Sequence, residues 1–169
     1  MNETLKVLVM DDPAYKVQDQ HFFSHFAEML ADNKKKKGGI EKLSLRLNQI
    51  RWEAIRIIFY RLATNRFLTV LDLSGNQIDF QGAIYLRDYL NSEKYSVCLK
   101  SLNLSRTKLY DSGAKILSDG LAKNKNLVHL DITSNSIKDE GFKYFAEKIK
   151  ENKGITSLKL FWDNEFGDE

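Results

Sequence analysis

The sequence predicts an α/β solenoid, a horseshoe with a parallel concave sheet of about six strands and helices on its outer side. Two observations predict this fold. An apolar frame begins near residues 5, 40, 68, 99 and 127 and partially at 155, and apolar residues at helical spacing follow each complete frame. Because one strand and one helix cannot bury their apolar sides alone, the units should stack into a single domain over residues 1–169.

Each frame follows the pattern LxxLxLxxN, in which isoleucine can replace leucine, and residues 68–76 and 127–135 are its clearest copies. We expect the first, fourth and sixth positions to enter the core, and the third, fifth and seventh to face solvent on the concave side. The ninth position holds Asn48, Asn76 and Asn135 but Pro13 and Thr107 in two other frames. In those two frames the ladder of asparagine hydrogen bonds between turns should be interrupted.

A helix should follow each complete frame with its apolar stripe against the sheet. Gly82, Gly113 and Gly141 stand near the starts of the last three helices. Strands pack about 4.8 Å apart and helices about 10 Å apart, so the stack should bend with its strands on the inside. In chain order, the residues expected on the stripes are Phe22, Phe23, Phe26, Met29 and Leu30; Ile55, Ile58, Phe59 and Leu62; Ala83, Leu86, Tyr89 and Leu90; Ala114, Leu117 and Leu121; and Phe142, Phe145, Ala146 and Ile149.

Residues 68–82, 99–113 and 127–141 resemble the ribonuclease-inhibitor-like subfamily of leucine-rich-repeat proteins. The LxxLxLxxN core, the 28-residue period and the glycine near each helix start carry the resemblance. It implies a non-enzymatic module that binds another protein on its concave face and inhibits it by steric occlusion. Other proteins with this repeat type imply two alternatives: a regulator of a small GTPase or of actin, and the recognition part of a larger enzyme such as a ubiquitin ligase.

Composition restricts the partner and the compartment. The net charge of +3 comes from 26 basic and 23 acidic residues, a balance that does not favour nucleic acid as a partner. Cys98 is the single cysteine, and the sequence shows neither a signal-peptide pattern nor a long apolar run. We therefore expect a cytoplasmic protein that does not enter membranes and is monomeric when unbound. The lysine- and asparagine-rich repeats also resemble host-directed bacterial effectors, for which the cytoplasm would be that of a host cell.

The predicted binding residues lie on the concave strand positions and the turns that follow them. Large aromatics and arginines supply most of the binding energy at interfaces, and Phe161 and Trp162 cannot both enter one core. Alternatively, Trp162 covers the last repeat. Asp72 and Asp131 share one column and form either an acidic stripe for a basic partner or a solvated strand face. The complete predicted set is Arg46, Asp72, Arg106, His129, Asp131, Lys159, Phe161 and Trp162.

No motif predicts catalysis, a metal site or a cofactor. His21 and His25 stand four residues apart, but no third ligand accompanies them. Cys98 precedes a strand and should be buried as a small apolar group. The acidic residues of the C-terminal segment lack the spacing of a calcium loop. Asp111 and Asp139 stand at helix starts, where carboxylates satisfy backbone amides, so we expect both to be structural.

Overall fold

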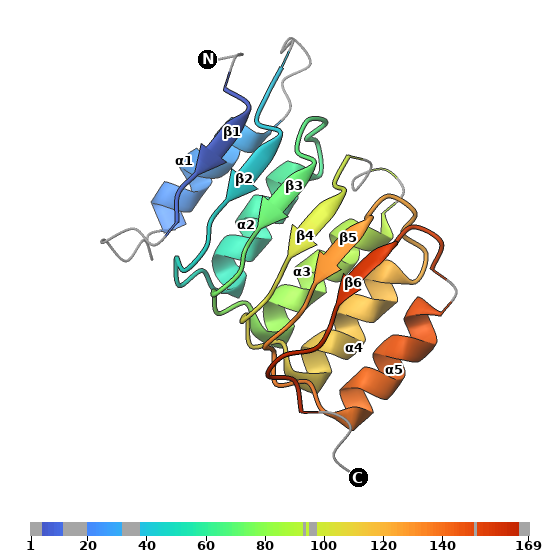
Figure 1. Cartoon of the computed structure of the whole chain (residues 1–169). Helices are drawn as coiled ribbons and strands as arrows, with labels where there is room; N and C mark the ends of the chain where they lie inside the picture. The colour runs from blue at the N-terminus through green and yellow to red at the C-terminus, as the bar shows by residue number, and fades with distance from the viewer. Residues whose placement is uncertain are drawn as a thin grey trace.

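The computed structural model describes residues 5–11, 20–31, 38–92, 94, 98–150 and 152–165. Its strands form one row, and its helices all lie on one face of the sheet (Figure 1). In chain order the elements are β1 Val7–Val9, α1 Gln20–Leu30, β2 Lys42–Ser44, α2 Trp52–Leu62, β3 Val70–Asp72, α3 Asp79–Asn91, β4 Ser101–Asn103, α4 Tyr110–Leu121, β5 His129–Asp131, α5 Asp139–Ile149 and β6 Ser157–Lys159. None of the described helices is long and apolar enough to cross a membrane.

The six strands are parallel and follow one another in sequence order, which confirms the predicted solenoid. Neighbouring strands pair so that equivalent frame positions lie side by side. Leu43 pairs with Leu71, Leu71 with Leu102, and Leu102 with Leu130. A column of equivalent residues therefore runs across the sheet at each frame position, with neighbours about 4.8 Å apart.

The core lies between the sheet and the helices and is built from the fourth and sixth frame positions. Leu71 and Leu73 are fully buried there, and burying each such side chain contributes about 2 kcal/mol. Two expectations fail in the first repeat: Leu5 and Met29 are exposed by 39% and 41%, respectively. Both lie at the end of the stack, where β1 pairs only with β2 among the described strands and α1 packs beside α2.

Asparagine side chains at the ninth frame position hold successive turns together. The Oδ1 atom of Asn135 accepts hydrogen bonds from the backbone amides of Thr107 and Leu109 in the preceding repeat, at 3.0 and 3.1 Å. Its Nδ2 atom donates to the carbonyls of Leu104 and Ile132, at 2.8 and 3.0 Å. With a further bond from Nδ2 to the carbonyl of Thr133, one buried side chain therefore bonds to five backbone groups in two repeats.

The asparagine ladder is only partly interrupted at Thr107, and a further asparagine, Asn164, extends it in the last turn. Thr107 is buried and its hydroxyl donates to the carbonyl of Leu104 at 2.6 Å, so it replaces one asparagine donor. In the last turn, Asn164 donates to Ile132 and Leu160 carbonyls and accepts from the amides of Asn135 and Ile137. Asn164 stands one residue beyond the ninth position. Pro13 lies outside the described residues.

A second set of asparagines secures the opposite edge of the sheet, and our reading of the frames missed it. Asn65, Asn124 and Asn152 precede their frames by three residues. The Nδ2 atom of Asn124 donates to the carbonyl of Leu90 in the preceding repeat at 2.7 Å, while its Oδ1 atom accepts the amides that lead into the next strand. Asn65 and Asn152 make equivalent bonds, so each links the end of one helix to the start of a strand.

Close packing of α3 and α4 depends on Gly120. A Cβ atom at this position would lie 2.6 Å from the Cα atom of Arg87 and 2.8 Å from its carbonyl oxygen. Backbone atoms cannot move aside as a flexible side chain can, so we expect Gly120→Ala to lower the free energy of unfolding by about 1–3 kcal/mol. Chemical denaturation measures this change, with Ser112→Ala on the exposed side of α4 as the control. Equal stability of the two variants would contradict this packing.

Cys98 is not fully buried, contrary to the sequence-based expectation. Its thiol is half-buried, and Sγ donates to the carbonyl of Arg66 at 3.1 Å. Burial of the Tyr89 hydroxyl raises its pKa, and the nearby thiol of Cys98 adds to this rise. The ring of Tyr89 packs edge-on against Phe59. The thiol of Cys98 therefore bonds to the segment that leads into β3.

Candidate protein-binding surface

The face of the sheet opposite the helices is open and carries the outward-facing frame positions (Figure 1). Of the predicted binding residues, Asp72, Asp131 and Lys159 share the fifth position on β3, β5 and β6. His129 is exposed at the third position of β5. This open face is the inner side of a stack that bends because its helices are wider than its strands.

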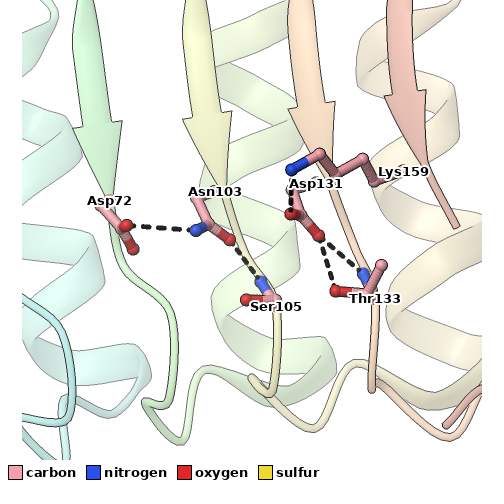
Figure 2. Close-up of polar contacts among 6 residues, drawn as sticks. All are labelled: Asp72, Asn103, Ser105, Asp131, Thr133 and Lys159. Carbon is pink, nitrogen blue, oxygen red and sulfur yellow. Dashed lines mark hydrogen bonds and ion pairs between the residues drawn. The ribbon is translucent and has the colours of Figure 1, made fainter. Parts of the chain in front are cut away.

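The fifth-position column is a hydrogen-bonded row rather than a stripe of free carboxylates (Figure 2). Asn103 lies between the two aspartates and donates from Nδ2 to Asp72 Oδ2 at 3.1 Å. Asp131 accepts hydrogen bonds from the amide and hydroxyl of Thr133, and its other oxygen lies 3.7 Å from Lys159 Nζ. Both aspartates are half-buried and engaged within the sheet, so their charges are largely committed to internal partners.

The eighth frame position forms a second row at the carboxyl edge of the sheet, where each strand enters its turn. This carboxyl-edge row consists of Leu47, Gly75, Arg106, Ser134 and Trp162, and all five have left-handed backbones, with φ of 59°, 71°, 57°, 55° and 83°. The tight turn requires this conformation, which glycine adopts most easily. A large side chain in this row therefore adds nothing to the turn itself.

Trp162 and Arg106 nevertheless occupy this row and project into solvent. Trp162 is 82% exposed and the neighbouring Phe161 is 70% exposed, so Trp162 does not cover the last repeat. Arg106 and, one position earlier in the second repeat, Arg46 are also exposed. Leu47 is half-exposed and lies against Gly75, where an added Cβ would be 2.4 Å from its side chain. The row combines two apolar ends with a central cation.

Replacing Arg106 by glycine should separate binding from folding. We expect Arg106→Gly to leave the free energy of unfolding unchanged or to raise it by up to about 1 kcal/mol, because it relieves a left-handed residue while increasing the freedom of the unfolded chain. Thermal and chemical denaturation measure this change, with Ser134→Gly as the matched control. A loss of more than about 1 kcal/mol would show that the Arg106 side chain supports the fold.

Other candidate chemistry gains no support from the described residues. No group of three or more histidines, cysteines, aspartates or glutamates among them could hold a metal ion. His25 is exposed, and the side chain of His21 lies outside the described residues. Asp111 accepts a hydrogen bond from the backbone amide of Lys138 at 2.7 Å and so links two repeats, as a structural residue should.

Comparison with known proteins agrees with the geometry. The family described as "Leucine Rich repeat" matches residues 64–86, 95–118 and 123–146. The fold is a leucine-rich-repeat solenoid. The chain is 32% identical to human NACHT, LRR and PYD domains-containing protein 13 over 124 residues. The aligned region covers 73% of this chain and 12% of that protein. It is 37% identical to mouse NACHT, LRR and PYD domains-containing protein 14 over 89 residues, and this aligned region covers 53% of this chain and 9% of the relative.

The leucine-rich-repeat chain therefore spans about a tenth of the length of these relatives. Among solved structures it resembles leiomodin-1 actin-binding site 2, with a TM-score of 0.70, 17% identity and coverage of 83% of this chain and 80% of the other. It also resembles the tropomodulin C-terminal domain of Caenorhabditis elegans, with a TM-score of 0.64, 14% identity and coverage of 86% and 84%. These likenesses concern the fold. The repeat family implies a module for protein–protein interaction.

Proposed function

We propose that the chain binds another protein across its open sheet face and carboxyl-edge row, and that it inhibits this partner by covering a working surface. The observation that carries the proposal is the exposure of Arg106 and Trp162 at left-handed positions, where Gly75 occupies the equivalent turn. A large side chain held in an unfavourable backbone region, and not needed for packing, points to a role outside the fold. Exposed tryptophan and arginine are the residue types that dominate binding energy at interfaces.

The size of the surface suits a specific complex. From β2 to β6 the carboxyl-edge row spans four strand spacings, about 19 Å. Together with the open face it can supply the ~800 Å² that one partner typically buries. The turns are fixed by the asparagine ladder, so little conformational entropy should be lost on binding.

The first test is affinity capture from a lysate of the source cell, or of its host if the protein is an injected effector, followed by reconstitution with the recovered protein. The bait is compared with a variant carrying Arg106→Glu and Trp162→Ala. A control carrying Arg56→Glu and Tyr60→Ala makes the same changes on α2, where both side chains are exposed. We expect the wild type and the control to bind the purified partner and the edge variant to lose it. Equal binding by all three would contradict the proposal.

Inhibition is then tested on the partner itself. Titrating the purified chain into an assay of the partner's activity should reduce that activity in proportion to the occupied fraction. A partner that stays fully active when saturated would make the chain a scaffold or a recruiting module rather than an inhibitor.

Actin is a second candidate partner, because leiomodin-1 actin-binding site 2 matches this fold over most of both chains. Sedimentation of the chain with filamentous actin, and gel filtration with monomeric actin, test it directly. Comigration that the edge variant abolishes would identify actin as a partner. Regulation of a small GTPase, recognition within a larger ligase, the ribonuclease-inhibitor-like repeat type and a bacterial origin stay predictions from the sequence.

A further inference from the structure

On the open face and at the carboxyl edge, the acidic side chains and the basic side chains differ in how many contacts they make within the protein. Each of the acidic side chains that the structure describes there accepts a hydrogen bond from a neighbouring residue. Asp11 accepts the hydroxyl of Ser44 and the amide of Arg46, and Asp163 accepts the hydroxyl of Ser134. Asp72 and Asp131 are held in the fifth-position column. These carboxylates would lose existing partners if they turned to bind a cation.

The basic side chains are exposed and mostly uncommitted. Lys42 on β2, Arg46 after β2 and Arg106 after β4 project into solvent, and no described residue forms an ion pair with their side chains. Lys159 approaches Asp131 at 3.7 Å, yet 70% of its side chain stays exposed. Lys42, Arg46 and Arg106 thus have no acidic partner among the described residues, whereas each of the four described carboxylates has a hydrogen-bond donor within the chain. These three cations are therefore the charged groups that can bind an incoming anion without first breaking an ion pair within the described residues.

The cations and the exposed apolar groups alternate along the carboxyl edge. Leu47 lies beside Arg46 in the second repeat, Arg106 follows two strands later, and Trp162 two strands after that. Strand spacing places these three groups about 10 Å apart in succession. A partner segment crossing the edge would therefore meet apolar contacts on both sides of a central guanidinium, which pairs best with a planar carboxylate.

We infer that the chain recognises an acidic protein segment, in which carboxylates engage Lys42, Arg46 and Arg106 and an apolar side chain packs on Trp162. The inference rests on the proposed binding function and specifies the chemistry of its partner. Of the two sequence-based alternatives for Asp72 and Asp131, it disfavours an acidic stripe for a basic partner, because both carboxylates already accept hydrogen bonds within the chain.

A phage-displayed library of random peptides, selected on the full chain, provides a defined probe. Selection runs in parallel on Lys42→Glu/Arg46→Glu/Arg106→Glu, the edge triple variant, and on the control Arg56→Glu/Lys123→Glu/Lys143→Glu. The control makes the same charge change at exposed residues on α2, in the turn after α4 and on α5. We expect the wild type and the control to enrich peptides rich in aspartate, glutamate and large apolar residues. The edge triple variant should lose that enrichment.

Synthetic copies of the enriched peptides then give the affinities. We expect binding to weaken at least about tenfold when salt rises from about 50 mM to about 500 mM, because exposed charge pairs are screened. The edge triple variant should weaken it at least about tenfold, and the control less than about threefold. Enrichment of neutral or basic peptides, absence of any enrichment, or equal losses in both triple variants would overturn the inference.

Failure of this inference is distinguishable from failure of the proposed function. If the captured protein still depends on Trp162 but binds equally well at high salt and to the edge triple variant, the binding surface stands and the acidic specificity is wrong. If the captured protein ignores both edge variants, the binding surface itself is wrong.

Discussion

Replacing Asn135 by alanine should lower the free energy of unfolding by about 3–5 kcal/mol, because it leaves two buried backbone amides without a partner and removes one of the two donors to each of two buried carbonyls. The amides of Thr107 and Leu109 and the carbonyls of Leu104 and Ile132 all bond to this side chain. Water cannot readily replace it, since Asn135 is 1% exposed. Chemical denaturation followed by circular dichroism measures the loss.

The control for this prediction is Asn91→Ala, which removes an exposed asparagine at the end of α3 and should change stability by less than about 0.5 kcal/mol. Asn135→Thr should be intermediate, because the hydroxyl of Thr107 keeps one equivalent bond in its own turn. If Asn135→Ala matched the control, the asparagine ladder would not hold the turns together.

Trp162→Ala should weaken binding of the partner about 30- to 1,000-fold while leaving the fold intact. Truncating an aromatic anchor of an interface typically costs about 2–4 kcal/mol of binding free energy. The free protein should lose less than about 0.5 kcal/mol of stability, because the indole is 82% exposed. Isothermal calorimetry with the reconstituted partner gives the affinity, and thermal denaturation gives the stability.

Tyr60→Ala is the matched control for the tryptophan, since Tyr60 is an aromatic side chain on α2 with 74% exposure. It should leave the affinity within about twofold of the wild type. An equal effect of the two substitutions would place the binding energy outside the carboxyl edge.

The repeated leucine frame was sufficient to predict the architecture. Leu71, Leu102 and Leu130 lie side by side in neighbouring strands because the same frame position recurs in each repeat. The pattern was less informative at the two ends of the stack, where Leu5 and Met29 in the first repeat and Ala146 on α5 are exposed, although all three were expected in the core. The frame predicts burial for a repeat that packs between two neighbouring repeats. A terminal repeat has a described neighbour on one side only, so some of its apolar side chains stay exposed.

In the turn after β6, counting frame positions did not identify the residue that makes the ladder bonds. Counting frame positions assigns the ninth place to Asp163, but Asn164 makes the ladder bonds. Trp162 and Asp163 both have positive φ, and this turn accommodates one more residue before the asparagine. A change of one residue in a turn leaves no mark in the apolar pattern. The earlier set at Asn65, Asn124 and Asn152 was visible in the sequence, and a search outside the frame would have found it.

The sequence identified the columns of the open face but not the state of their charges. Asp72 and Asp131 could be placed in one column from spacing alone. Their contacts come from Asn103 and Lys159 on neighbouring strands and from the backbone amides of the loops that follow β3 and β5. Such contacts can be identified only when register and side-chain geometry are both known, and they leave the two aspartates less available to a basic partner.

Hydrogen exchange of the chain with and without its reconstituted partner tests the binding surface most directly. We predict slower exchange in the complex at the turns spanning residues 46–49, 105–108, 133–136 and 161–164, which form or flank the carboxyl-edge row. The outward sides of α1 to α5 should exchange as in the free chain. Protection confined to the helices, with unchanged exchange in these turns, would contradict binding through the open face and carboxyl edge.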